Sequence, residues 1–141
     1  MTDQPNSAAT MPMDQVLKTP GLACWYEIPV TDLKAAQAFY ETVLGIKMTY
    51  ADNPVLPNPM VWFADPETPG AFGHLYPGKP APTNEGPTVH ILASDALEEV
   101  MPRVEAAGGK VVSPIVPLPV GRFVYITDPD GNSIGLFNWA Q

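Results

Sequence analysis

The sequence predicts an α+β fold built from two tandem βαβββ modules. The first observation is an internal repeat at an offset of 63 residues, where Thr31-Asp32 returns as Ser94-Asp95, Gly45 as Gly108, Lys47 as Lys110, Pro54 as Pro117 and Asp65-Pro66 as Asp128-Pro129. The second is that each copy combines one helical pattern with several short strand patterns. The third is that 45% of the 141 residues are hydrophobic, which suffices for one compact core.

The first module opens with a strand pattern of aromatic and β-branched residues over 22–30. Pro29 indicates that this strand lies at a sheet edge or ends there. Thr31 is expected to cap a helix that ends at Gly45, with Asp32 in its first turn. Three further strands are expected over residues 46–50, 60–64 and 71–76, with a proline-rich segment at 52–59.

The second module repeats this order with strands over 88–93, 110–112, 123–127 and 133–137 and a helix over 94–107. Pro102 lies inside the helical pattern, so the helix is expected to begin late or to be kinked. A proline-rich stretch, 113–121, is expected to be a rigid loop. The chain therefore divides into a flexible N-terminal segment (1–20), a first module (21–76), a proline-rich connector (77–87) and a second module (88–141).

Charge and composition exclude several classes of partner. Seven Lys and Arg against 15 Asp and Glu give a formal net charge of −8, so neither nucleic acid nor an anionic membrane is an expected partner. Cys24 is the only cysteine, which excludes an intrachain disulfide and a cysteine-based zinc site. The first twenty residues lack the basic and apolar regions of a signal peptide, so a cytoplasmic location is expected.

The segment EIPVTDLKAAQAFYETVLG in the first module, and VEAAGGKV with YITDPDGNSIGLF in the second, are similar to the vicinal oxygen chelate superfamily. This group includes glyoxalase I, bleomycin-resistance proteins and extradiol dioxygenases, and the similarity covers residues 22–138. It implies that the modules form a curved mixed sheet around a central cup, where two side chains from each module hold a divalent metal. It also implies a homodimer, because cups in this superfamily are often completed between subunits.

The resemblance implies four metal-ligand positions, of which two carry residues that cannot bind a metal. The position on the first strand holds Trp25, and the position on the last strand of the second module holds Gly135. The register of the other two strands is open, and a shift of one residue moves a side chain to the opposite face. Their ligand positions fall on Gly73 or His74 and on Val89 or His90. At most two ligands, His74 and His90, are retained, so no complete metal centre and no other cofactor is expected.

Glu27 lies two residues from Trp25 and therefore shares its face of the strand. It is the candidate base. If Glu27, His74 and His90 converge, they form an incomplete metal site or an acid-base cluster with shifted pKa values; otherwise Glu27 is simply solvated. Aromatic side chains on the inner face are either core or the walls of a pocket for a flat or apolar ligand. The candidate substrate-binding residues are Trp25, Glu27, Trp62, His74, His90, Tyr125 and Phe137.

Four function classes are compatible with these residues. The preferred one is a protein that binds a small, partly aromatic or apolar molecule in a cup without a complete metal site. The alternative is a divalent-metal-dependent lyase, isomerase or dioxygenase-like enzyme that uses His74 and His90. A metal-free enzyme with Glu27 or a histidine as base, and a regulatory or subunit partner, complete the set. No catalytic triad, phosphate loop or redox motif supports another named reaction.

Overall fold

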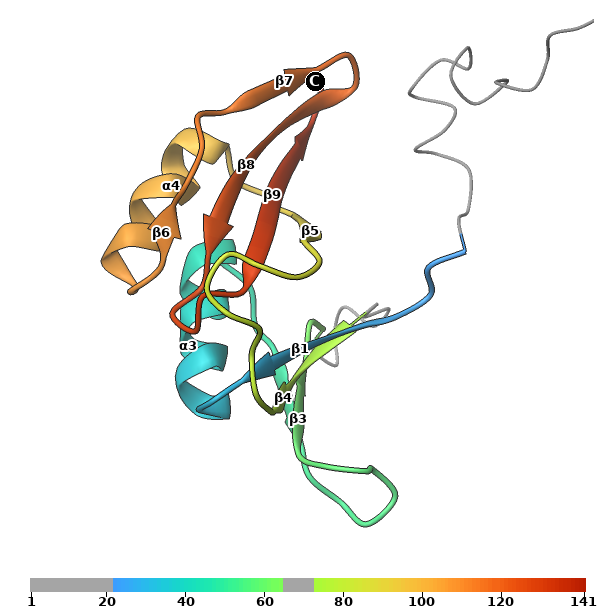
Figure 1. Cartoon of the computed structure of the whole chain (residues 1–141). Helices are drawn as coiled ribbons and strands as arrows, with labels where there is room; N and C mark the ends of the chain where they lie inside the picture. The colour runs from blue at the N-terminus through green and yellow to red at the C-terminus, as the bar shows by residue number, and fades with distance from the viewer. Residues whose placement is uncertain (1–21, 65–72) are drawn as a thin grey trace, which may run out of the picture.

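The computed structural model describes residues 22–64 and 73–141 and confirms the α+β class with two modules in tandem (Figure 1). The first module comprises β1 (Tyr26–Val30), α3 (Leu33–Leu44), β2 (Thr49–Ala51), β3 (Met60–Trp62) and β4 (Gly73–Pro77). The second comprises β5 (Val89–Leu92), α4 (Leu97–Ala106), β6 (Lys110–Val111), β7 (Val116–Leu118), β8 (Gly121–Thr127) and β9 (Ser133–Trp139). The expected N-terminal segment and the DPETPG loop lie outside the described residues.

Each module has its own sheet, and the two sheets share one topology. The strand orders are β1-β4-β3-β2 and β5-β9-β8-β6, with β7 also paired to β8. In both sheets the first strand runs parallel to the last, and the remaining pairs are antiparallel. The sequence repeat therefore reflects a repeated fold. Pro29 is tolerated because β1 is an edge strand, as expected.

The N-cap of the first helix lies one residue later than expected. Asp32, with extended backbone, accepts a hydrogen bond from Ala35 N at 3.0 Å and is the N-cap. Thr31 instead donates its hydroxyl to Asp130 of the second module at 2.6 Å. The helix ends where expected, at Gly45, which adopts the left-handed conformation with φ of 66°.

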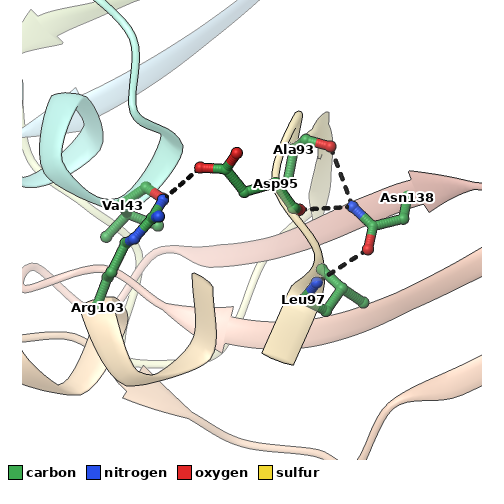
Figure 2. A network of polar contacts seen from close by, with 6 residues as sticks. All are labelled: Val43, Ala93, Asp95, Leu97, Arg103 and Asn138. Atoms are coloured by element: carbon green, nitrogen blue, oxygen red, sulfur yellow. Dashed lines mark hydrogen bonds and ion pairs between the residues drawn. The ribbon is translucent and has the colours of Figure 1, made fainter. Parts of the chain in front are cut away.

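The second helix, α4, begins at Leu97 rather than Ser94, in agreement with a late start before Pro102. Its cap residue, Ala96, has no side chain that can accept a hydrogen bond. Asn138 of β9 replaces the missing cap: its Oδ1 accepts from Leu97 N at 2.9 Å, and its Nδ2 donates to two carbonyls of the preceding loop (Figure 2). The amide side chain thus joins the last strand to the helix start.

The proline-rich segment after β6 is not entirely a loop, which corrects the sequence expectation. Val116–Leu118 forms β7, paired antiparallel with Gly121–Phe123 of β8. Pro117 lacks an N–H, but β7 pairs on one side only, so the missing donor costs no hydrogen bond within the sheet. The second module consequently has one more strand than the expected pattern.

The core lies between the helices and the sheets, and the two helices contact each other on one side of the molecule (Figure 1). The modules are also joined by polar contacts. Tyr40 Oη donates to Asp128 Oδ2 at 2.7 Å, and Asn132 Nδ2 donates to the Pro29 carbonyl at 2.9 Å. Within the described ranges, neither helix has the length and apolar character needed to cross a bilayer.

Candidate functional site

One face of each sheet packs on the helices, and we call the other the open face. In β1, Ile28 and Val30 are buried in the core, whereas Glu27 is exposed on the opposite side. In β8, Val124 and Ile126 are fully buried, and Phe123 and Tyr125 point the other way. This follows from the alternation of side chains along a strand. Every sequence-predicted site residue lies on an open face or directly before it.

The strand register settles the two ambiguous positions. Glu27 is opposite His74 in the β1–β4 pair, so both side chains lie on the open face. Gly73 is opposite Tyr26, whose ring occupies the space that a side chain at position 73 would need. In the second sheet, Val89 packs on the core, and His90 takes the open face. Of the residues considered for these positions, His74 and His90 are therefore the ones whose side chains lie on the open faces.

Three side chains form a linked group on the open face of the first sheet. Trp25 Nε1 donates to His74 Nδ1 at 2.8 Å, and His74 Nε2 lies 3.3 Å from Glu27 Oε1. Because an indole N–H can only donate, this bond leaves the Nδ1 lone pair as acceptor and places the imidazole proton on Nε2. His74 is 6% exposed, whereas the Glu27 side chain is 59% exposed. Glu27, the candidate base, thus faces solvent beside a buried imidazole.

His90 lies in a different environment on the second sheet. Its ring packs edge-on against Phe123 and Tyr125, with ring centroids 5.2 and 5.9 Å away, and lies directly over Gly135. Partial burial lowers the pKa of His90 below its ordinary value. The structure therefore brings Glu27 and His74 together but leaves His90 out of their group. In the described part of the chain, no three His, Cys, Asp or Glu side chains gather as a metal site would require.

The open face of the second sheet carries an aromatic array. Phe123 and Tyr125 contact each other edge-on at 5.0 Å, and Phe137 and Trp139 do so at 4.8 Å. Trp139 is 45% exposed and the neighbouring Leu92 is 56% exposed. Sequence reasoning selected Tyr125 and Phe137 but missed Phe123, which the alternation along the same strand would have placed beside Tyr125.

A cleft of about 830 Å³ adjoins this array where β5 and β9 meet the start of α4. Leu92 and Trp139 form its apolar walls, and Asn138 and Arg122 contribute polar groups. Arg122 donates two 2.6 Å hydrogen bonds to the carboxylate of Glu98, and these bonds hold the Glu98 pKa below its usual range. The cleft therefore has apolar walls and one charged side chain, Arg122, which is paired with Glu98.

Residues 23–136 match the family model described as Glyoxalase/Bleomycin resistance protein/Dioxygenase superfamily. The chain belongs to this superfamily. It is 32% identical over 122 residues to the "Putative glyoxylase CFP32" of Mycobacterium bovis, covering 83% of this chain and 45% of that protein. It is also 32% identical over 119 residues to the uncharacterized protein PA2024 of Pseudomonas aeruginosa, covering 79% of this chain and 84% of the relative.

Solved structures of this superfamily have the same fold. Glyoxalase I from Zea mays superposes with a TM-score of 0.57 at 27% identity, over 82% of this chain and 45% of that one. The fosfomycin resistance protein FosX from Listeria monocytogenes superposes with a TM-score of 0.60 at 18% identity, over 86% and 95%. The chain spans about half the length of CFP32 and of the maize enzyme.

The divalent metal that glyoxalase-superfamily membership implies does not fit these residues. At the first ligand position, Trp25 has no lone pair and instead occupies the Nδ1 acceptor of His74. At the last, the ring of His90 covers Gly135. A metal on His74 Nε2 would require the imidazole proton to move to Nδ1, which would break the hydrogen bond from Trp25. The residues at these positions form a polar and aromatic surface and not a metal centre.

Proposed function

We propose that this glyoxalase-superfamily chain binds a small, partly aromatic or apolar molecule against the open faces of its two sheets. The observation that carries the proposal is the array of aromatic side chains that the fold keeps out of its core. Phe123, Tyr125, Phe137 and Trp139 form two edge-on pairs, and Trp139 also lines the cleft described above. Flat aromatic walls with few polar groups are typical of ligand pockets.

The first sheet supplies the polar side of the proposed site. Trp25 and Trp62 add aromatic surface there, and Glu27 and His74 add a carboxylate beside an imidazole N–H. Such a combination suits orientation of a ligand by one or two hydrogen bonds within an apolar contact area. Since the residues at the metal-ligand positions do not fit a metal, the proposed binding relies on aromatic packing and hydrogen bonds alone.

A thermal-shift screen of aromatic metabolites and antibiotics tests this function, because a ligand that binds only the folded state raises the melting temperature. Tyr125→Ala removes one wall of the array and should weaken binding of any hit about fivefold, the factor that one aromatic contact supplies. Tyr50→Ala is the matched control: Tyr50 is 45% exposed and faces Lys34 on the helix side of the first sheet. Failure of every compound, or equal losses in both variants, would contradict the proposal.

We also propose that two copies of the chain pair through their open faces. Leu92, Trp139 and Trp25 are all at least 45% exposed there, and exposed apolar groups of this size favour association. Light scattering during size-exclusion chromatography should give the mass of a dimer for the full chain. Trp139→Glu should give the monomer, whereas Tyr50→Glu should remain dimeric. A monomeric parent chain would refute the pairing without affecting the aromatic site.

A further inference from the structure

Two buried N–H donors on the open face of the first sheet have no hydrogen-bond partner among residues 22–64 and 73–141. They are Nε2 of His74, in a residue only 6% exposed, and Nε1 of Trp62. Trp62 and His74 are register partners in the antiparallel pair of β3 and β4. Directly opposed residues have Cβ atoms about 5 Å apart and point to the same face. Both donors therefore belong to one small region.

Both nitrogens can only donate. An indole N–H has no acceptor lone pair. His74 Nδ1 already accepts from Trp25 at 2.8 Å, so the imidazole proton is on Nε2. Glu27 Oε1 approaches this Nε2 to 3.3 Å but lacks the alignment of a hydrogen bond, so within the described part of the chain the donor has no acceptor. Buried polar groups are nearly always paired in folded proteins, so two unpaired donors on neighbouring strands require an explanation.

We propose that His74 Nε2–H and Trp62 Nε1–H form a two-donor subsite for a carbonyl or hydroxyl oxygen of an uncharged aromatic ligand. The inference rests on the proposed function and specifies its ligand class. Two donors require an acceptor oxygen, and the Trp25 and Trp62 rings favour an aromatic body next to it.

The charge of the ligand follows from Glu27. Its carboxylate lies beside Nε2 and would repel an anionic oxygen. The Arg side chains that form ion pairs in the described ranges are engaged elsewhere, Arg103 with Asp95 and Arg122 with Glu98. A neutral oxygen acceptor avoids this repulsion and still takes both hydrogen bonds.

The test compares three probes of similar size on the full ¹⁵N-labelled chain: acetophenone, toluene and benzoate. Acetophenone carries the carbonyl, toluene lacks any oxygen, and benzoate carries a charge. We expect acetophenone to bind about threefold to tenfold more tightly than toluene, the factor that one or two neutral hydrogen bonds supply. It should also shift the Trp62 indole N–H signal in the NMR spectrum, and benzoate should bind more weakly than acetophenone.

Trp62→Phe keeps an aromatic ring but removes the N–H, so it should reduce the preference for acetophenone over toluene to below about twofold. Tyr50→Phe, on the helix side of the first sheet and outside the proposed site, is the control and should keep the preference. His74→Gln gives an independent measurement, because its amide N–H can still donate. It should retain part of the preference that His74→Phe loses.

The outcomes separate the subsite from the proposed function. Equal affinities for acetophenone and toluene, or an unchanged preference in Trp62→Phe, overturn the subsite while aromatic binding stands. Tighter binding of benzoate overturns the assignment of an uncharged ligand. If neither acetophenone nor toluene binds up to its solubility limit, the subsite is overturned, and the thermal-shift screen decides separately whether the proposed function stands.

Discussion

The hydrogen bond between Tyr40 and Asp128 should hold the two modules together, and Tyr40→Phe tests this directly. Both side chains are buried, at 0% and 3% exposure, and their oxygens are 2.7 Å apart across 88 residues of sequence. A hydrogen bond to a charged group contributes about 1.5–3 kcal/mol. Asp128 keeps three other donors, from Asp130 N, Asn132 N and Asn132 Nδ2. The expected loss is therefore about 2 kcal/mol, in the lower part of that range.

For a chain of this size, such a loss lowers the melting temperature by about 7 °C. Urea unfolding gives the free energy, and calorimetry gives the melting temperature. Tyr50→Phe is the control, because the Tyr50 side chain is 45% exposed. A loss below about 0.5 kcal/mol for Tyr40→Phe, the level of surface substitutions, would show that the pair does not support the module interface.

The same pair predicts a response to high pH. Burial, followed by the nearby Asp128 carboxylate and its hydrogen bond, raises the pKa of Tyr40 well above its ordinary value. Because the unfolded chain loses the Tyr40 proton first, stability from this group is complete below about pH 10 and declines as the pH rises further. The parent chain should therefore lose stability more steeply than Tyr40→Phe above pH 10. Burial also raises the pKa of Tyr26 to about 12, and this contribution is common to both proteins.

Three further predictions concern the second module. Asn138→Ala removes three hydrogen bonds at the start of α4 and should lower the free energy of unfolding, measured in urea, by about 2–3 kcal/mol. The control Asn53→Ala, in an exposed loop, should lower it by less than about 0.5 kcal/mol. Gly135→Ala should lower the free energy of unfolding by about 1–3 kcal/mol, because the new Cβ would overlap the His90 ring. In a His90→Ala background this loss should be smaller. Equal losses in the two backgrounds would show that the ring is not the obstacle. Burial lowers the pKa of His90, so the stability from its neutral form is present above about pH 6.5 and declines as the pH falls. His90→Phe should therefore show a weaker loss than the parent between pH 7.5 and 5.5, and parallel urea midpoints would contradict this.

Much of the fold followed from patterns within short segments. The repeat predicted two equivalent modules, and the spacing of Leu33, Ala36, Tyr40 and Val43 predicted α3 up to Gly45. The N-cap was predicted one residue too early, because both Thr31 and Asp32 can cap a helix and the choice depended on Asp130 of the other module. The β7 strand was missed, since proline content indicated a loop, and only pairing with β8 makes it a strand.

In the candidate site, too, local patterns identified the residues, and contacts between distant segments decided how they are arranged. The sequence identified Trp25, Glu27, His74 and His90 as residues of interest but left the register of two strands open. A shift by one residue reverses the face of every side chain in a strand, and only pairing between distant segments fixes it. The register placed His74 against Glu27 and Trp25, and it placed His90 over Gly135.

The amino-acid sequence by itself determined the duplication, the order of the helices and of every strand except β7, and the presence of Trp25 and Gly135, which offer no metal donor, at two positions where the family resemblance implies ligands. These properties depend on residue chemistry and on neighbours a few positions apart. The tertiary structure alone decided that Trp25 fixes the imidazole proton of His74, that His90 stands apart, and that Trp62 shares a face with His74. Each of these depends on hydrogen bonding or packing between segments far apart in the chain, which no local pattern encodes.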